Sequence, residues 1–297
     1  MIVRGGRWGR AGATGLMLAL ALVLVLGLLA GHAHAQVFYR ITSAAGEPSW
    51  LLGTIHSEDP RLLDFPPVLR QALVEANVLA LELVPDAELL ARLETETQLP
   101  GDARLDQMLS PEMYRRTHEA LRLHGLEDEQ IVRLRPWAAA MLLAQPPVQT
   151  GRSMDLELAR TAMAGGTVAV ALELLDEQLA IFAGLDLCLQ RKLLQHALDG
   201  LDQSREVFGQ LIDAYLAGDL EGIAAQAEAQ IAQLPAKLQS RFREQGLASR
   251  NRRMAERAQP MIDEGRVLIA VGALHLHGED GLVALLREQG HQVEAVY

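Results

Sequence analysis

The sequence predicts an α/β protein with a mainly parallel central sheet and a large helical insertion. Three observations support this fold class. Apolar runs that suit buried strands lie near both ends of the chain, and segments with helical periodicity follow them. Several of these runs are apolar on both faces, as in parallel strands that helices cover on both sides. The middle of the chain is mostly helical, and about five predicted strands flank it.

The first part of the chain predicts two strands, a helix and a third strand. The segment 37–41 alternates in polarity and predicts an edge strand. A second strand, 50–52, ends in Gly53-Thr54-Ile55-His56. A polar loop and a helix over 68–76 then lead to the continuous apolar run 78–84, which predicts a buried parallel strand.

The same order of elements recurs near the C-terminus. A strand over 266–271 ends in Gly272-Ala273-Leu274-His275, and a helix over 282–289 follows, with Gly290 at its C′ position. A strand over 292–297 completes the unit. Strand, Gly-x-x-His, helix and strand thus occur twice, and we interpret this as two duplicated halves. The alternative is that any two βαβ units look alike at this level.

The segment between the two copies is mostly helical. Its first helix has Ser110 as N-cap and Pro111 at N1. One strand interrupts the helices, and its Ala171-Leu172-Glu173-Leu174 repeats Ala80-Leu81-Glu82-Leu83 letter for letter. The predicted helices are 111–123, 126–134, 137–144, 155–164, 179–198 and most of 208–264. We therefore expect a single domain over 36–297 with a helical insertion at about 100–165 and 179–262.

Residues 1–35 have the pattern of a cleavable secretory signal peptide. A positive segment with three arginines precedes an apolar run over 16–30, and Ala33-His34-Ala35 suits a signal peptidase. We expect cleavage after Ala35 and export to the periplasm or the extracellular space, with no membrane contact afterwards. An uncleaved anchor is the alternative, although the run is short for a span of about 20 residues.

Net charge and cysteine content exclude some classes of binding partner and some kinds of site. The formal net charge is −11, and loss of three arginines makes it −14. This acidity argues against nucleic acid and an anionic membrane surface. The single cysteine, Cys188, excludes an intramolecular disulfide and a cysteine-rich zinc site, and its apolar neighbours predict that it is buried. The sequence does not indicate the oligomeric state.

The two motif histidines follow strands, where ligands bind in parallel α/β sheets. The glycine of each motif permits a sharp exit from the strand and a close approach of backbone to a ligand. Glu82 and Glu173 also lie near strand ends. A carboxylate in an apolar run is costly to bury unless it binds a cation or hydrogen-bond donors. A strand-end salt bridge is the structural alternative for each glutamate.

Two histidines and one glutamate make an acceptable ligand set for zinc, manganese, cobalt or iron(II). A metal held this way activates water and polarises a carbonyl group. Without metal, the same side chains can act as general base and orienter for water, and the spacing does not choose between the two. His277 is a further ligand if its segment is extended, or else a loop residue bonded to backbone. No His-Glu-x-x-His or Gly-x-Ser-x-Gly pattern occurs.

Arg250 and Asp155 each stand near the start of a helical stretch. Arg250 can clamp a substrate carboxylate or a developing oxyanion. Alternatively, it is one more charge on a basic helical face.

Taken as an ordered set, these residues resemble the TraB/GumN family, relatives of the TIKI metalloproteases, over nearly the whole chain after residue 35. Met154 departs from the family, which often has Leu there, but Asp155 beside it is retained. The resemblance rests on Leu52-Gly53-Thr54-Ile55-His56, Leu81-Glu82-Leu83, Arg135-Pro136-Trp137, Met154-Asp155, 172–178, Arg250-Asn251, and Val271-Gly272-Ala273-Leu274-His275-Leu276-x-Gly278.

The resemblance implies an erythromycin-esterase/ChaN-like α/β fold and a divalent-metal-dependent peptidase. It implies manganese, cobalt or zinc on His56, Glu82 and His275, and Glu173, Arg250 and Asp155 as further catalytic residues. Relatives differ in chemistry: TIKI proteins look like proteases, erythromycin esterases resemble metal-free lactone hydrolases, and ChaN-like proteins bind haem. We therefore predict an exported metal-dependent hydrolase acting on a peptide or small molecule. The alternatives are a haem or small-ligand binding protein, a metal-free esterase, and a helical interaction module.

Overall fold

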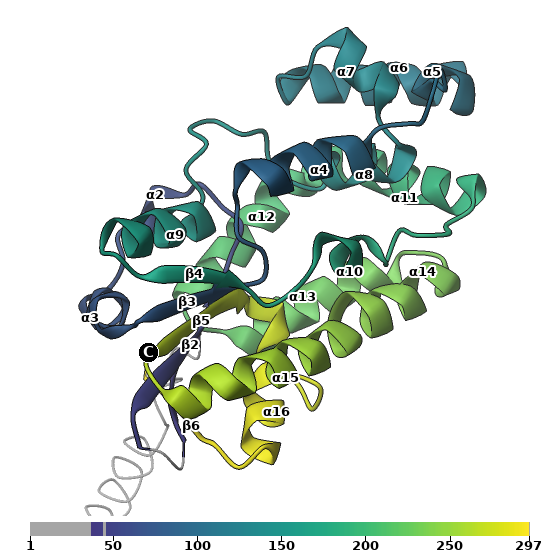
Figure 1. Cartoon of the computed structure of the whole chain (residues 1–297). Coiled ribbons are helices and arrows are strands. Elements are labelled where there is room, and N and C mark those ends of the chain that lie inside the picture. The colour runs from purple at the N-terminus through teal and green to yellow at the C-terminus, as the bar shows by residue number, and fades with distance from the viewer. Residues whose placement is uncertain (1–36, 44–45, 297) are drawn as a thin grey trace, which may run out of the picture. The chain divides into compact units, whose positions relative to one another are not determined.

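Within the residues that the computed structural model describes, 37–43 and 46–296, six strands form one sheet in the order β4-β3-β5-β2-β1-β6 (Figure 1). Strands β4, β3, β5 and β2 are parallel neighbours, whereas β1 is antiparallel to both β2 and β6. The strands are β1 Phe38–Thr42, β2 Pro48–Thr54, β3 Val78–Leu81, β4 Val168–Ala171, β5 Val267–Gly272 and β6 Gln292–Ala295. The mixed α/β class and the mainly parallel sheet are confirmed.

The helices begin and end near the predicted positions in most cases. They are α2 Pro60–Leu63, α3 Pro67–Glu75, α4 Ala87–Thr97, α5 Leu105–Met108, α6 Pro111–Leu123, α7 Asp128–Arg133, α8 Pro136–Leu143, α9 Met154–Ala164, α10 Leu175–Leu179, α11 Leu187–Asp199, α12 Leu201–Leu216, α13 Leu220–Ala232, α14 Ala236–Arg241, the π-helix η1 Phe242–Ala248, α15 Ser249–Glu264, the 3₁₀-helix η2 Ala273–His275 and α16 Leu282–Glu288. Ser110 caps α6 by accepting from the N–H of Met113, and Gly290 has a φ of +92° after α16, as predicted.

Parallel register aligns the ends of the four central strands. Thr54, the last residue of β2, pairs with Gly272 of β5, and Leu81 of β3 pairs with Ala171 of β4. The loops that follow β2, β3, β4 and β5 therefore leave the sheet at one edge. This is the edge at which ligands bind in α/β sheets.

The predicted edge strand 37–41 is an interior strand. Tyr39 pairs with Leu51 on one side and with Ala295 on the other, and Phe38 and Ile41 are fully buried. The prediction was wrong because the partner on the second side, β6, comes from the far end of the chain. The outermost strands of the described sheet are β4 and β6.

Two further expectations are corrected. The helix predicted over 179–198 begins only at Leu187, because Gly184 adopts a φ of +68° and Asp186 caps α11 by accepting from the N–H of Leu189. Cys188 is exposed rather than buried. It lies at the start of α11, whose buried face is formed by other residues, including Leu189 and Leu193.

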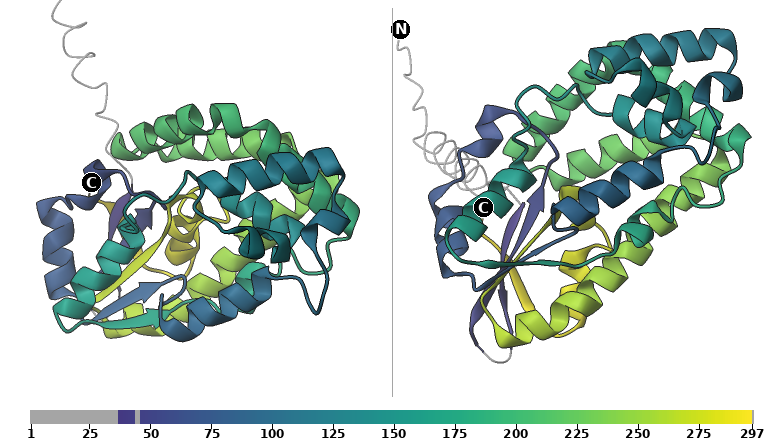
Figure 2. Two further views of the ribbon diagram at one scale, coloured as in Figure 1. Left: turned by 90° about the horizontal axis from the view of Figure 1, so that it is seen from above. Right: turned by 45° about the horizontal axis from the view of Figure 1, so that its top comes forward.

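The buried side chains form two clusters. One lies on both sides of the sheet, and the other lies among helices α5 to α8, α11 and α14. The right view in Figure 2 shows α14, η1 and α15 as one long helix that joins the two parts. The second cluster falls largely within the stretches predicted as a helical insertion; the limits of that insertion stay a prediction.

The internal duplication also stays a prediction. The connection from β2 to β3 crosses one strand, β5, whereas the connection from β5 to β6 crosses two, β2 and β1. The predicted signal peptide, residues 1–35, lies outside the described residues. In the described part of the chain, no helix has the length and apolar character needed to cross a membrane.

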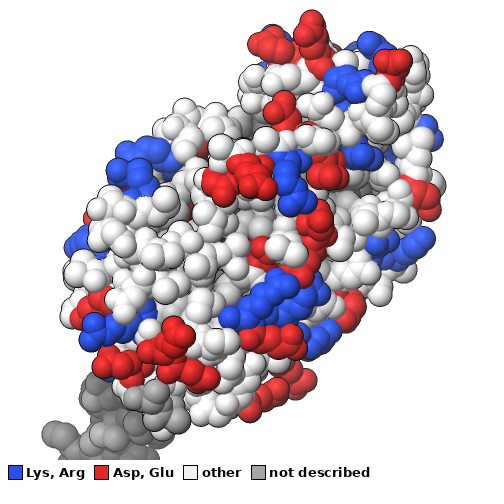
Figure 3. Space-filling view, viewed as in Figure 1, with Lys and Arg blue, Asp and Glu red and all other residues white. Residues whose placement is uncertain are grey.

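Charged side chains of both signs are spread over the face that Figure 3 shows, but not evenly. Uncharged atoms cover the area of β4 and α9, and charged residues lie around it (Figure 3). The exposed apolar residues of these two elements include Leu156, Met163 and Val168.

Candidate functional site

The segments after the four parallel strands, together with helices α9 and α15, bring the six candidate residues into two groups. Glu82, Glu173, Arg250 and His275 form the first group, and His56 and Asp155 form the second. The two histidine motifs are joined through their backbones, because Thr54 pairs with Gly272 across β2 and β5. The Glu82 carboxylate also contributes to raising the pKa of His56, so the groups share one electrostatic environment.

Arg250 lies between the two strand-end glutamates. Its Nη2 is 2.6 Å from Glu82 Oε2 and 2.5 Å from Glu173 Oε2, and its Nε donates to both oxygens of Glu173 at 2.9 and 3.1 Å. Gln178 Nε2 also donates to both carboxylates, at 3.0 and 3.1 Å. The two identical strand ends thus lie side by side and share two donors. The strand-end ion pair considered for each glutamate is present.

Burial distinguishes the two glutamates. The Glu173 side chain has no exposed surface, and its carboxylate contacts Arg250 and Gln178. The Glu82 side chain is 25% exposed, and its Oε1 accepts from the N–H of Gly272 at 2.7 Å. Glu82 therefore presents an oxygen to the site, whereas Glu173 lies behind Arg250.

The pKa values of this group favour charged carboxylate and guanidinium. Burial opposes ionisation of Glu82, but the charge of Arg250 and the hydrogen bond from the Gly272 N–H hold its pKa below the usual value. Burial likewise lowers the pKa of Arg250, yet hydrogen bonding to Glu173 and the charge of Glu82 outweigh it and raise that pKa. At neutral pH the cluster is a buried ion network.

His275 is held by Asn251, a residue of the same long helix that carries Arg250. Asn251 Oδ1 lies 2.5 Å from His275 Nδ1, and Asn251 Nδ2 donates to the carbonyl of Asp280 at 2.8 Å. Because the amide nitrogen faces a carbonyl, the amide oxygen faces the ring, and Nδ1 of His275 must carry the proton. Burial lowers the pKa of His275, which favours the neutral ring. Nε2 therefore has a free lone pair.

The geometry around this lone pair suits a cation. Nε2 of His275 lies 3.7 Å from Glu82 Oε1, and in the neutral tautomer that Asn251 selects both atoms are acceptors. Two ligands of a tetrahedral metal, each at about 2.1 Å, are about 3.4 Å apart. A divalent ion fits these two donors, and the carbonyl-type contact on the other ring nitrogen is the usual arrangement for a metal-binding histidine.

His56 is paired with Asp155. Its Nδ1 lies 2.8 Å from Asp155 Oδ2, and Thr54 Oγ1 donates to Asp155 Oδ1 at 2.6 Å. Hydrogen bonding to Asp155 raises the pKa of His56, although desolvation opposes this. The His56 side chain is 76% exposed. With Nδ1 engaged, Nε2 is the nitrogen that remains for a ligand.

The motif glycines are required by close packing rather than by an unusual φ. A Cβ on Gly53 would lie 3.0 Å from both the Cα of Ala273 and the Cδ2 of Leu276, which belong to the second motif region. A Cβ on Gly272 would lie 3.3 Å from Glu82 Oε1. The first glycine lets the two motifs touch, and the second makes room for the glutamate.

Not all candidates are gathered into one set. Among the described residues, no three histidine, cysteine, aspartate or glutamate side chains are arranged to hold a metal together. His56 contacts Asp155, while His275 and Glu82 face each other. His277 is exposed. The segment before it is 3₁₀-helical rather than extended, so His277 does not lie beside His275 as an extended segment would place it.

Three residues of the site had no assigned role at the level of sequence: Asn251, Gln178 and Thr54. Asn251 and Gln178 were visible only as parts of the family resemblance. A polar residue on a helix gives no signal of its own, since solvent-facing positions are usually polar.

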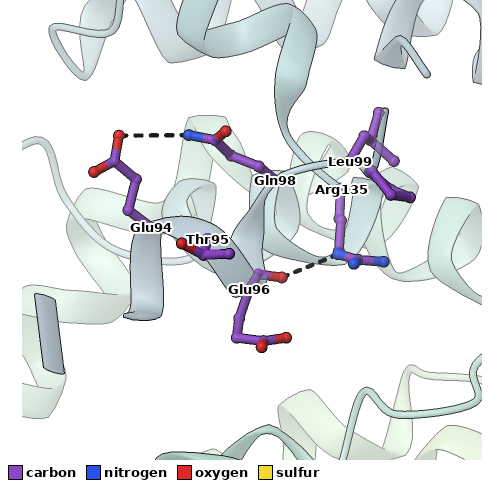
Figure 4. Close-up of a pocket in the computed structure, with 7 residues that line it drawn as sticks. Glu94, Thr95, Glu96, Gln98, Leu99 and Arg135 are labelled. Atoms are coloured by element: carbon purple, nitrogen blue, oxygen red, sulfur yellow. Dashed lines mark hydrogen bonds between the residues drawn. The ribbon is translucent and has the colours of Figure 1, made fainter. Parts of the chain in front are cut away.

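A separate surface hollow of about 430 Å³ lies at the end of α4, beside Glu94, Glu96 and Arg135 (Figure 4). None of the six candidate residues lines it.

Comparison with known proteins gives the following matches. Residues 37–295 match the TraB/PrgY/gumN family. Metalloprotease TIKI1 of Danio rerio is 30% identical, over 83% of this chain and 60% of its own length. Metalloprotease TIKI2 is 27% identical in Danio rerio and 26% identical in Xenopus tropicalis, over 83% of this chain and 58% and 57% of their lengths. The chain thus spans less than two thirds of these relatives. No solved structure matches.

Proposed function

We propose that this chain, which belongs to the TraB/PrgY/gumN family, is an exported metal-dependent hydrolase that acts on peptide bonds. Two kinds of support carry the proposal. The similar proteins are named metalloproteases, and the similarity extends over 83% of this chain. The site offers the Nε2 of His275 and the Oε1 of Glu82, 3.7 Å apart, and Nε2 is an acceptor in the tautomer that the Asn251 contact selects. That pair is the single observation on which the proposal depends most.

In this proposal His275 and Glu82 hold the metal, and His56, which contacts Asp155 in this structure, would complete the ligand set. When bound, a divalent cation supplies a Lewis acid that lowers the pKa of a water molecule and polarises a carbonyl group. The protein's own residues orient these donors. Asn251 keeps the proton of His275 on Nδ1, and Asp155 engages Nδ1 of His56. Both imidazoles are thereby left with Nε2 for the cation.

Arg250 and Glu173 support the proposed metal site through Glu82. Arg250 binds Glu82 Oε2 and so directs Oε1 toward His275. Glu173 holds Arg250 through two oxygens and is a positioning residue. Nη1 of Arg250 contacts only the carbonyl of Gly246 at 3.3 Å among its described neighbours. It is the part of the guanidinium that can donate to a substrate carboxylate or oxyanion.

A second reading rests on the close contact of His56 and Asp155. An exposed imidazole held by a carboxylate through Nδ1 has the arrangement of a general base and its orienter. In that reading His56 removes a proton from water without a metal, and Asp155 stabilises the imidazolium that forms. This is the metal-free hydrolase considered from the sequence.

Metal analysis of the purified chain, combined with peptide hydrolysis, tests the proposal. We expect manganese, cobalt or zinc to bind with defined stoichiometry and to restore hydrolysis after chelation. His275→Ala should abolish both, and His277→Ala is the matched control, because His277 is exposed two residues away. Unchanged metal content and hydrolysis in His275→Ala would refute it. Hydrolysis that survives chelation but is lost in Asp155→Asn would support the metal-free reading instead.

A further inference from the structure

Strand β4 leaves one side of its backbone open. The N–H of Val168 donates to Asn77 and that of Leu172 donates to Leu81, so alternate residues of β4 face β3. The N–H and C=O groups of Ala169 and Ala171 therefore point away from the sheet. Because β4 is the outermost strand on this side, these groups face outward (Figure 1).

The two outer strands of the described sheet differ in how they are protected. Strand β6 carries Glu294, and Arg287 Nη2 donates to the carbonyl of Val293 at 2.7 Å. Strand β4 reads Val-Ala-Val-Ala, with no charge and no proline. Proteins normally protect an edge strand with charges, prolines or covering side chains, since an open edge pairs with other chains. Because β6 is protected in this way, β4 differs from it in having an unprotected edge.

The helix beside this edge has an exposed apolar stripe. Helix α9 packs against β4, and Leu156 and Met163 are 43% and 58% exposed. They are seven residues apart and so lie on one face of the helix. Val168, the first residue of β4, and Leu174, three residues beyond its last residue, are each 60% exposed. Figure 3 shows this area as the uncharged part of its face. An apolar patch next to an open strand indicates a protein interface.

We propose that β4 pairs with β4 of a second copy of this chain, antiparallel about a two-fold axis at Val170. In this arrangement Ala169 of one copy lies opposite Ala171 of the other. Each of these two pairs can exchange both N–H···O bonds, since these residues carry the outward groups. The two sheets join into one continuous sheet. A two-fold axis places the same surface on both sides, and a pattern centred on Val170 satisfies that requirement.

The same axis also covers the apolar stripe. It stands perpendicular to the sheet, so the α9 helices of the two copies lie on the same face, side by side and antiparallel. Their stripes of Leu156 and Met163 then face each other. Val168 of one copy lies opposite residue 172 of the other, with Leu174 as its diagonal neighbour. An extended peptide bound to β4 would use the strand edge but leave the stripe on α9 exposed. A second copy uses both.

Charge does not oppose this approach. Two arginines lie beside the proposed interface: Arg160, on α9 between Leu156 and Met163, pairs with Glu157, and Arg257 donates to the carbonyl of Leu172 at 2.7 Å. Its guanidinium is neutralised by both oxygens of Glu177, at 2.6 and 2.7 Å. Like charges from two copies are thus compensated beside the proposed interface.

Sedimentation of the purified protein over a range of concentrations tests the proposal, and we expect a dimer. Met163→Glu places a charge in the stripe and should raise the dissociation constant about tenfold or more. Leu123→Glu is the matched control, because Leu123 is 79% exposed on α6, away from β4, and should leave the dimer intact. A protein that stays monomeric at all concentrations, or a dimer unaffected by Met163→Glu, would overturn the proposal.

Disulfide trapping tests the register directly, in a Cys188→Ser background. Residue 170 faces its own copy in a non-hydrogen-bonded pair, with Cα atoms about 4.5 Å apart, which a disulfide can bridge. Val170→Cys should therefore form a covalent dimer on mild oxidation, whereas Val168→Cys should not. Equal trapping at both positions, or at neither, contradicts the register. A monomer whose Ala169 and Ala171 amides become protected from hydrogen exchange only with added peptide would show a peptide as the occupant instead.

Discussion

Asn251 Oδ1 lies 2.5 Å from Nδ1 of His275, and this buried contact determines which nitrogen of the imidazole carries the proton. Asn251 and His275 are only 2% and 5% exposed, so water does not compete for the contact. The orientation of the amide is set in turn by the carbonyl of Asp280. A backbone carbonyl in one loop thereby controls the lone pair that faces Glu82.

Asn251→Ala should return His275 to the tautomer with the proton on Nε2. The ¹⁵N chemical shifts of the ring, measured without metal at neutral pH, distinguish the two tautomers. We also expect metal affinity to fall about 10- to 100-fold, as for other partners of metal-binding histidines. Asn251→Asp keeps an acceptor in place and should keep the Nδ1–H form. If Asn251→Ala leaves the ring shifts unchanged, Asn251 does not set the tautomer.

Arg250→Ala should destabilise the protein strongly, because it leaves Glu82 and the fully buried Glu173 without their common cation. Loss of one partner of a buried ion pair costs about 3–5 kcal/mol. The control is Arg252→Ala, which removes exposed ion pairs to Glu244 and Asp280 and should cost about 0–1 kcal/mol. Urea unfolding measures both. Equal losses in the two variants would mean that the buried network contributes no more than surface charges.

Gly53→Ala should push the two histidine motifs apart. The new Cβ meets the backbone of Ala273, which cannot move aside as a flexible side chain can, and we expect a loss of about 1–3 kcal/mol. Gly209→Ala is the control, and we expect it to change the stability in the opposite direction. Gly209 lies inside α12 with nothing within 4 Å of an added Cβ. Alanine there should stabilise the helix by about 0.5–1 kcal/mol. Thermal unfolding that shows the same sign for both variants would contradict this account.

Glu177 should make stability depend on pH in acid. Its hydrogen bonds to Arg257 lower the pKa of Glu177 to about 2, against the burial that would raise it. The folded carboxyl releases its proton more readily than the unfolded one, so the stabilisation is present above about pH 4.5 and is lost as pH falls toward about 2. Glu177→Gln should remove about 1–2 kcal/mol of this dependence, with allowance for partial exposure. In contrast, Glu221→Gln, an exposed control on α13, should keep the wild-type slope.

The sequence was sufficient to predict that the two histidine loops leave the same edge of the sheet. Both motifs follow apolar runs that end in glycine, and parallel strands place such exits together. It also predicted that Glu82 and Glu173 both lie near strand ends, because their apolar contexts are identical. Short-range signals worked for the same reason: the cap at Ser110 and the glycine after α16 depend on neighbouring residues only.

What could not be predicted depends on contacts across long stretches of chain. The pairing of β1 with β6 requires the two ends of the sequence to meet, so residues 37–41 looked like an edge. The partner of His56 is Asp155, on a helix almost one hundred residues later. The contact of Asn251 with His275 depends on how the long helix is rotated over the sheet. No local pattern reports such a rotation.

The π-helical turn η1 determines that rotation. From Ala236 to Glu264 the backbone stays helical, so α14 and α15 are two parts of one rod, and the wider turn at Phe242–Ala248 sets their phase. Each residue of a helix turns the next by about 100°. Deleting one residue from η1 would thus swing Arg250 and Asn251 away from Glu82 and His275 together. The number of residues in this turn therefore determines the site geometry as much as the identity of the site residues does.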